Sequence, residues 1–321
     1  MTAASTITAA PTITTAPTIT TAPTTTTAPT RTAAPTITTA PTITTAPTRT
    51  VAPTITTAPT MTPDYHATLA ALPTLTLDEL VATAAMQTRI DRKYLLPRAA
   101  LAEVVAAVAT EAAILDIDGQ RAFGYRSVYL DTPDLDSYFA AGRGRRRRFK
   151  VRTRSYLDTG TTWLEIKTRG PRGTTVKERI AHPDAEAAGL TAAGQAFLAQ
   201  CLGSALIPTD VVADLVPVLA TAYRRTTLRL GSAGAHARAT LDTDLGWSTL
   251  GEAPADLDRP DLAIIETKAG ASPTALDRAL WRRGHRPVRI SKFGTGLAAL
   301  DPGLPHLKWH RTLHRGLAIS A

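Results

Sequence analysis

The sequence predicts an α+β fold in which a closed or strongly curved β-sheet surrounds a charged interior. Three observations support this prediction. Several segments alternate charged and apolar residues with a period of two, which is typical of strands with two different faces. Lysine or arginine recurs on one face of at least five of these segments. Segments rich in Ala and Leu lie between them and predict short helices.

The chain divides by composition into two parts. Residues 1–62 repeat a hexapeptide close to TITTAP, with a proline at every sixth position from Pro11 to Pro59. We expect this repeat to be disordered, because it has no helical or strand period and each proline removes a backbone donor. It lacks an apolar run of signal-peptide or transmembrane length. Residues 63–321 are predicted to form one domain; the repeat before Met61 is either a genuine tail or translated upstream DNA.

The formal net charge is +9, and residues 1–62 contain two cations, Arg31 and Arg49, and no acid, so the remainder carries +7. This basic excess predicts an anionic partner: phosphate, nucleic acid or acidic lipid. Cys201 is the single cysteine, which excludes an internal disulfide or a multi-cysteine zinc site. We interpret it as a buried apolar side chain in a protein of the reducing cytoplasm.

Lysine is rare in this basic chain. Of 36 Lys and Arg residues, seven are lysines, at positions 93, 150, 167, 177, 268, 292 and 308. Where lysine persists, the site favours a compact ammonium group over a planar guanidinium. Five of the seven fall in the strand-like segments and a sixth in a motif near the C-terminus; chance scatter is the alternative.

Five helices are predicted outside the repeat. Thr76 and Glu79 form a candidate capping box at the start of the first. Residues 98–112 predict an Ala-rich second helix. Shorter helices are predicted over residues 134–141, 191–202 and 273–284.

Six segments predict strands with charge on one face. The in-phase residues are Arg89, Asp91 and Lys93 in QTRIDRKYLL; Lys150, Arg152 and Arg154 in FKVRTRSY; Glu165, Lys167 and Arg169 in TWLEIKTR; Lys177 and Arg179 in TTVKERI; Arg238, Thr240, Asp242 and Asp244 in HARATLDTD; and Glu266 and Lys268 in LAIIETKAG. The turn residues GPRG at 170–173 make residues 162–180 a predicted hairpin. Arg145, Arg146 and Arg147 are expected at a strand entrance.

Two interpretations of the charged faces remain open. One is a half-buried sheet whose charged face meets water. The other is an enclosed interior, as in a barrel of about eight strands. Enclosed cations are costly to desolvate, so they require a wet interior that holds a polyanion. The second interpretation predicts a channel for phosphates, with carboxylates that bind a bridging divalent metal.

Nine stretches in order resemble a known family. They are RIDRKYLL (89–96), YRSVYLDTPDLDSY (125–138), RFKVRTRSY (148–156), WLEIKTR (163–169), VKERI (176–180), AYRRTTLR (222–229), ARATLDTDL (237–245), IIETKAG (264–270) and RISKFGTG (289–296). The core is similar to the VTC domain of the CYTH-like triphosphate tunnel metalloenzyme superfamily, whose founding members are polyphosphate polymerases.

The resemblance implies an eight-stranded antiparallel tunnel, a closed barrel with helices packed outside. It implies ATP as phosphoryl donor, inorganic polyphosphate as the growing chain, and Mn²⁺ or Mg²⁺ as cofactor. The catalytic residues it implies are Lys93, Arg152, Arg154, Lys167, Lys177, Lys268, Ser291 and Lys292. Lys150, Arg224, Arg238 and Arg289 would bind substrate, and Glu266 and Glu165 the metal.

The sequence departs from the family pattern before the first lysine. Many tunnel enzymes carry E-x-E-x-K there, whereas this chain has Arg89 and Asp91. This difference favours a polymerase over an inorganic triphosphatase. A non-catalytic module that binds polyphosphate or nucleic acid is the alternative from another class. No specific nucleic-acid partner and no transmembrane segment are expected, and a peripheral membrane contact has no supporting signal.

We find no HExxH motif and no paired metal-ligand spacing among the seven histidines. His182, His236 and His285 are expected on the surface or in loops. The C-terminal stretch is interpreted either as a solvated basic helix face or as a lip that gathers polyphosphate or touches acidic lipid. Its residues are His306, Lys308, His310, Arg311, His314 and Arg315.

Overall fold

The computed structural model describes residues 63–83, 90–170, 173–184, 187–231 and 237–318. All of them belong to one compact unit that extends from Thr50 to Ala321. The TITTAP repeat, Arg89 and His236 lie outside the described residues. The disorder expected of the repeat therefore stays a prediction.

An eleven-stranded sheet forms the centre of this unit. Its main path runs in the order β2 (Ile90–Pro97), β11 (Leu262–Ala269), β9 (Ala237–Thr249), β8 (Val216–Leu230), β4 (Phe123–Asp131), β5 (Phe149–Tyr156), β6 (Thr161–Arg169) and β7 (Thr175–His182). All neighbours on this path are antiparallel. The short strands β1 (Thr74–Leu75), β3 (Ala112–Leu115) and β10 (Asp256–Arg259) pair at its margins.

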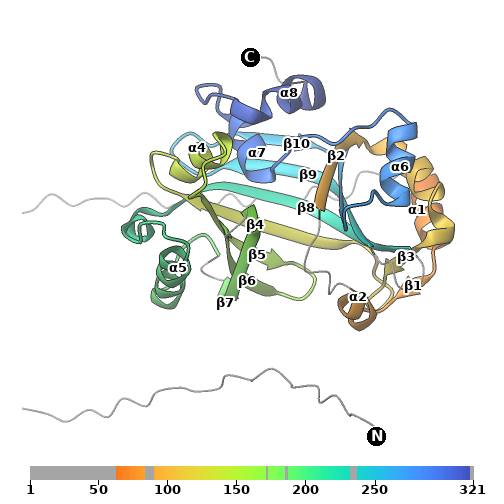
Figure 1. Cartoon of the computed structure of the whole chain (residues 1–321), viewed down its shortest axis with the longest axis horizontal. Coiled ribbons are helices and arrows are strands. Elements are labelled where there is room, and N and C mark those ends of the chain that lie inside the picture. The colour runs from red at the N-terminus through yellow and green to blue at the C-terminus, as the bar shows by residue number, and fades with distance from the viewer. Residues whose placement is uncertain (1–62, 84–89, 171–172, 185–186, 232–236, 319–321) are drawn as a thin grey trace, which may run out of the picture. The chain divides into compact units, whose positions relative to one another are not determined.

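The sheet is strongly curved but is not closed by hydrogen bonds. In Figure 1, β8 and β9 run across the picture, whereas β2 and β6 are steeply inclined to them. No backbone pairing joins β2 to β7 within the described ranges. The α+β class with a large antiparallel sheet is confirmed, and the predicted closed barrel is not.

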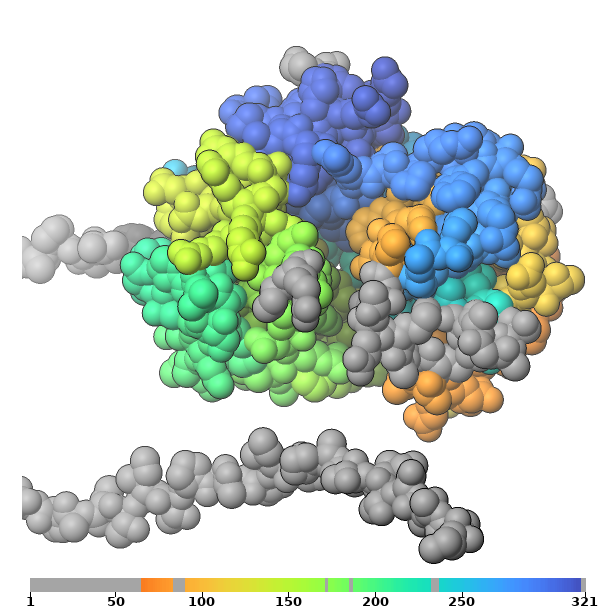
Figure 2. Space-filling model, in the orientation of Figure 1, coloured from red at the N-terminus to blue at the C-terminus, as the bar shows by residue number. Residues whose placement is uncertain are grey.

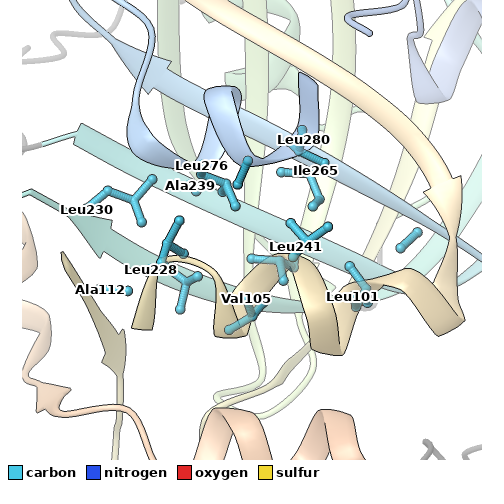
Figure 3. Packing of buried hydrophobic residues seen from close by; sticks show 14 of the residues in the cluster. Leu101, Val105, Ala112, Leu228, Leu230, Ala239, Leu241, Ile265, Leu276 and Leu280 are labelled. Atoms are coloured by element: carbon cyan, nitrogen blue, oxygen red, sulfur yellow. The ribbon is translucent and has the colours of Figure 1, made fainter. Parts of the chain in front are cut away.

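The outer face of the sheet carries the apolar residues of the alternating pattern. Figure 3 shows helices α3 (Leu101–Ala106) and α6 (Ala275–Arg282) packed against β8, β9 and β11. Leu228, Leu241 and Ile265 project from the three strands into this buried cluster. Because side chains alternate along a strand, packing these residues outward directs their neighbours to the inner face.

Two further apolar clusters pack other helices against the sheet. Helix α5 (Ala192–Ser204) packs Leu198 and Leu202 against Leu164 and Ile166 of β6, and Cys201 is buried beside them as predicted. Helices α4 (Asp136–Gly142) and α7 (Lys292–Leu300) and the helical turns Leu307–Trp309 and Leu313–Leu317 surround a second cluster, and α8 (His310–Thr312) joins the two turns. Its large members are Tyr138, Trp247, Phe293 and Trp309.

Most predicted helices are present, and one is wrong in its second half. Helix α2 (Leu77–Thr83) begins with the predicted capping box, in which the Thr76 N–H donates to Glu79 Oε2 over 2.7 Å. Helices α4, α5 and α6 match the next three predictions. The helix expected over 98–112 ends at Ala106, and Ala112–Leu115 form β3 instead. Sheet pairing with β8 outweighs the helix propensity of alanine there.

His182 also differs from expectation. We expected a surface or loop histidine, but it ends β7 and is buried. Its ring Nδ1 lies 2.9 Å from the Pro183 carbonyl. An isolated histidine in a strand end is therefore a core residue here.

Candidate functional site: a basic cavity on the inner face of the sheet

The inner faces of all eight main strands line one cavity of about 750 Å³. Figure 2 shows the surface hollowed between the green side chains of β5–β7 and the orange and blue ones of β2 and α6. The edge strands β2 and β7 both contribute lining residues. Curvature alone thus brings the two edges of the sheet to a common space.

The lining is strongly cationic. Among the described residues, fourteen Lys and Arg line the cavity, against the two carboxylates of Asp91 and Glu266. All seven lysines of the chain are among them. A sheet face that only met water would be stabilised by a mixture of positive and negative charges, and lysines would also lie on other surfaces. The concentration of cations in this cavity therefore indicates an anion-binding interior.

Strands β5, β6 and β7 place like charges side by side. Lys150 lies opposite Lys167, which lies opposite Lys177. Like charges directly opposite one another destabilise a sheet unless something compensates them. This row indicates a wall built to face an anion.

Glu165 is the carboxylate that organises this wall. Its Oε2 accepts from Arg152 Nε and Nη2 over 2.8 and 2.5 Å, and its Oε1 accepts from Lys177 over 2.5 Å. Burial alone would raise the pKa of Glu165, but nearby cations outweigh burial and hold it well below its usual range. Glu165 does not itself line the cavity; it orients Arg152, which does.

Glu266 occupies the opposite wall. Its Oε1 lies 2.9 Å from Lys93 Nζ on β2 and 2.8 Å from Lys268 Nζ on its own strand. Burial opposes its ionisation, yet these two lysines hold its pKa well below the usual value. Glu266 is therefore an anionic carboxylate exposed to the cavity and surrounded by cations.

A third carboxylate on the inner face, Asp242, is buried and was not among the predicted site residues. It pairs with Arg225, over 2.6 Å, and with Lys292. Asp242 lies in phase with Arg238 on β9, and this phase was the signal that could have identified it. Arg225 lines the cavity, whereas the predicted Arg224 donates to the Ala122 carbonyl over 2.9 Å.

The N-terminus of α7 meets the cavity beside these residues. Ser291 is its N-cap and accepts from the Gly294 N–H, over 3.3 Å, and from Lys150 Nζ, over 2.8 Å. Lys292 Nζ lies 4.2 Å from the centroid of the Tyr223 ring. A helix N-terminus favours negative charge, so α7 adds to the field of the cations.

Burial and mutual repulsion weaken the protonation of the enclosed lysines. Burial, then the charge of Arg152, lowers the pKa of Lys150 to about 7. Burial likewise lowers the pKa of Lys268 to about 8 and that of Lys167 well below its usual value. An anion in the cavity would stabilise the charged form of each.

Two hydroxyl groups of the lining deserve comparison with the described residues around them. The Tyr223 Oη and Thr240 Oγ1 atoms are buried without a hydrogen bond to any described residue. Buried polar groups are nearly always hydrogen-bonded. Each hydroxyl therefore retains an unused hydrogen bond beside the cavity.

The structure brings together eleven of the fourteen predicted site residues around the cavity. They are Lys93, Lys150, Arg152, Arg154, Lys167, Lys177, Arg238, Glu266, Lys268, Ser291 and Lys292. Glu165, Arg224 and Arg289 are not part of the lining, and Arg289 is exposed. The predicted site residues did not include the lining residue Lys308, which was considered only as part of a possible lip, or the tyrosines Tyr125, Tyr129, Tyr156 and Tyr223.

A curved antiparallel sheet with a cation-lined interior defines an anion-binding protein of the α+β class. Residues 88–301 match the VTC domain family, and the chain belongs to this family. No curated protein matches the chain. None of the described helices is both long enough and apolar enough to cross a membrane.

Solved structures resemble parts of the chain at low identity. A putative adenylyl cyclase from Hippeastrum, described as having a dominant triphosphatase activity, is 14% identical, with a TM-score of 0.39 over 68% of this chain and 99% of that one. A Pyrococcus horikoshii protein is 13% identical, with a TM-score of 0.36 over 65% and 98%. A putative adenylate cyclase from Vibrio parahaemolyticus is 14% identical, with a TM-score of 0.33 over 61% and 82%.

Proposed function

We propose that this protein is an ATP-dependent polyphosphate polymerase that transfers the γ-phosphoryl group of ATP to a growing polyphosphate chain. The observation that carries the proposal is that every lysine of a VTC-domain chain lines the cavity. Lysine offers a compact charge that can follow successive phosphates of a chain, whereas arginine holds individual oxygens with a rigid fork.

In this proposal the terminal oxygen of the chain attacks the γ-phosphorus of ATP. A new P–O bond forms, and the bond from the γ-phosphorus to the bridging oxygen breaks, with its electron pair leaving on ADP. The attacking phosphate is already ionised, so no general base is required. Catalysis then consists of alignment and charge stabilisation, for which Arg152, Arg154 and the lysine row are placed.

Glu266 is the residue that fits a divalent cation. Mg²⁺ and Mn²⁺ are commonly bound by one or two carboxylates together with substrate phosphates and water, and would stabilise the leaving oxygen. Glu266 is an ionised carboxylate of the lining, and Asp91 on the neighbouring strand lies opposite Lys268. Glu165 fits less well, because Arg152 and Lys177 already occupy both of its oxygens.

An inorganic triphosphatase is the second candidate, and the same cavity would serve it. Hydrolysis requires a base to activate water, for which paired carboxylates are suited. Each of Glu165, Glu266 and Asp242 instead contacts two cations. This arrangement favours transfer to an ionised phosphate.

The proposed location of the protein is the cytoplasm. The buried free Cys201 suits this reducing compartment.

Product analysis distinguishes the candidates. The full chain is incubated with ATP and Mn²⁺ or Mg²⁺, and the products are separated on a gel before and after digestion with an exopolyphosphatase. The proposal predicts a ladder that the exopolyphosphatase removes, together with ADP. Orthophosphate as sole phosphate product would indicate a triphosphatase, and no turnover with any metal would indicate a binding module.

A further inference from the structure

Three histidines converge in the segment that follows α7. His306, His310 and His314 recur every fourth residue through consecutive helical turns: Leu307–Trp309, α8 and Leu313–Leu317. Residues four apart share one face of a helix. The sequence-based view that the histidines lack metal spacing is therefore wrong for these three.

The three rings have the geometry of a nearly assembled ligand set. One nitrogen from each histidine lies within 4.8 Å of the others. The ring centroids of His310 and His314 are 4.2 Å apart, and that of His306 lies 5.9 and 5.4 Å from them. Nitrogens about 2.0–2.1 Å from one tetrahedral ion are about 3.4 Å apart, so small side-chain rotations would complete the site.

A second observation points to a ligand at this place. His314 Nε2 is buried and has no hydrogen-bond partner among the described residues. An unpaired buried ring nitrogen is unusual, and a metal ion would satisfy it.

The donor set selects the kind of ion. Imidazole suits Zn²⁺, Cu²⁺, Ni²⁺ and related ions, whereas Mg²⁺ and Mn²⁺ prefer oxygen ligands. The group consists of histidines alone. It is thus chemically distinct from the carboxylate of Glu266 and would not compete for the same ion.

We propose that His306, His310 and His314 bind one Zn²⁺-like transition-metal ion, with a fourth position open to water or an anion. Lys308, Arg311 and Arg315 make the same segment basic, which is compatible with an anion at that position. Lys308 and Trp309 lie between His306 and His310 in the sequence, and both line the cavity. The Lys308 amine also donates to the Ala141 carbonyl. The bound ion would fasten this segment and so hold the two side chains at the wall of the cavity.

Metal titration of the full chain, without an affinity tag of histidines, tests the proposal. Co²⁺ serves as a spectroscopic probe, because its visible absorption reports nitrogen ligands and coordination number, and Zn²⁺ is then added to displace it. We expect one equivalent of Co²⁺ to bind, Zn²⁺ to displace it, and Zn²⁺ to raise the melting temperature. None of these readouts requires ATP or turnover, so they are independent of the proposed polymerase activity.

His310→Gln is the informative variant, because His310 is exposed and its replacement leaves the core intact. We expect at least a tenfold loss of Co²⁺ affinity in His310→Gln and also in His314→Gln. His66→Gln, at an exposed histidine of helix α1 (Pro63–Ala70), is the matched control and should bind as the wild type does. Absence of saturable Co²⁺ and Zn²⁺ binding, or unchanged affinity in a folded His310→Gln protein, would overturn the proposal.

Discussion

At the scale of single residues, three carboxylates on the inner face of the sheet determine where the cations of the cavity point. Glu165, Glu266 and Asp242 each contact two basic side chains. Only Glu266 also lines the cavity. The three residues therefore have different tasks: two position cations, and we propose that the third, Glu266, binds the metal ion.

Replacement of Glu266 tests this division. We expect Glu266→Ala to lower turnover about 100-fold or more, because a ligand of the metal that stabilises the leaving oxygen is lost. Triphosphate binding measured by calorimetry without metal should persist, because the cations remain. Glu178→Ala, an exposed carboxylate on the outer face of β7, is the control. Normal turnover in Glu266→Ala would refute the metal assignment.

The pKa of Lys150 predicts a pH dependence of binding. Lys150 loses its proton above about pH 7 in the unliganded protein, whereas bound triphosphate stabilises the charged form. Binding above pH 7 therefore takes up a proton, and affinity should fall as pH rises from 7 to 9, by up to about tenfold per unit for one lysine. The measurement is calorimetric titration with inorganic triphosphate across this range.

Lys150→Arg is the matched comparison for that titration. Arginine keeps its charge throughout the range, so the variant should show a shallower loss of affinity with pH. Some loss of affinity with rising pH should remain in the variant because of Lys268, whose pKa is lowered to about 8. A slope identical to that of the wild type would show that Lys150 is not the titrating group.

At the scale of elements, α7 connects the apolar core to the site. Its glycines allow close packing: a Cβ on Gly294 would overlap the ring of Trp309, and one on Gly296 the ring of Trp247. The Trp247 ring N–H also donates to the Lys292 carbonyl over 2.8 Å. These contacts fix the helix so that its N-terminus meets the cavity.

Two helix caps allow the structural and binding roles of α7 to be separated. Ser291→Ala should cost about 1 kcal/mol of stability, because the N-cap is lost, and should also weaken triphosphate binding, because Lys150 loses its partner. Thr274→Ala removes the cap of α6 on the outer face and should cost stability without changing binding. Denaturant unfolding and calorimetry measure the two quantities. Equal effects of both variants on binding would contradict the role of Ser291.

The periodicity of the sequence predicted the inner faces of most strands but not of all. Alternation identified the inner faces of β2, β5, β6, β7, β9 and β11, because one apolar face must be buried. Alternation could not decide whether Arg224 or Arg225 of β8 faces the cavity. A shift of one residue moves a side chain to the other face of the sheet, and both residues are arginines. The periodicity also missed β3, where tertiary pairing outweighs local propensity, and the lack of backbone closure between β2 and β7, which depends on curvature.

At the scale of the whole molecule, the lysine side chains are confined to one place. All seven lysines line the cavity, so a reagent for amines reports on that cavity and on the chain N-terminus. The lowered pKa values of Lys150 and Lys268 leave more of the reactive neutral amine near neutral pH. Lysine chemistry is therefore a probe of the interior.

Reductive methylation followed by peptide mass spectrometry uses this property. We expect inorganic triphosphate or polyphosphate to slow modification of the lysines several-fold, because the anion both covers the amines and favours their protonation. Sulfate at the same ionic strength is the control for screening. Modification that is rapid at all seven lysines and insensitive to polyphosphate would contradict the view that the cavity holds a phosphate chain.

The most direct test of the central claim is phosphorus NMR of the reaction of the full chain with ATP and Mg²⁺. The method distinguishes phosphorus inside a chain from terminal phosphate, orthophosphate and ADP. A polymerase predicts that one internal chain phosphate appears for each ADP released, with little orthophosphate. Release of ADP with orthophosphate alone, by a protein that binds triphosphate normally, would contradict the claim.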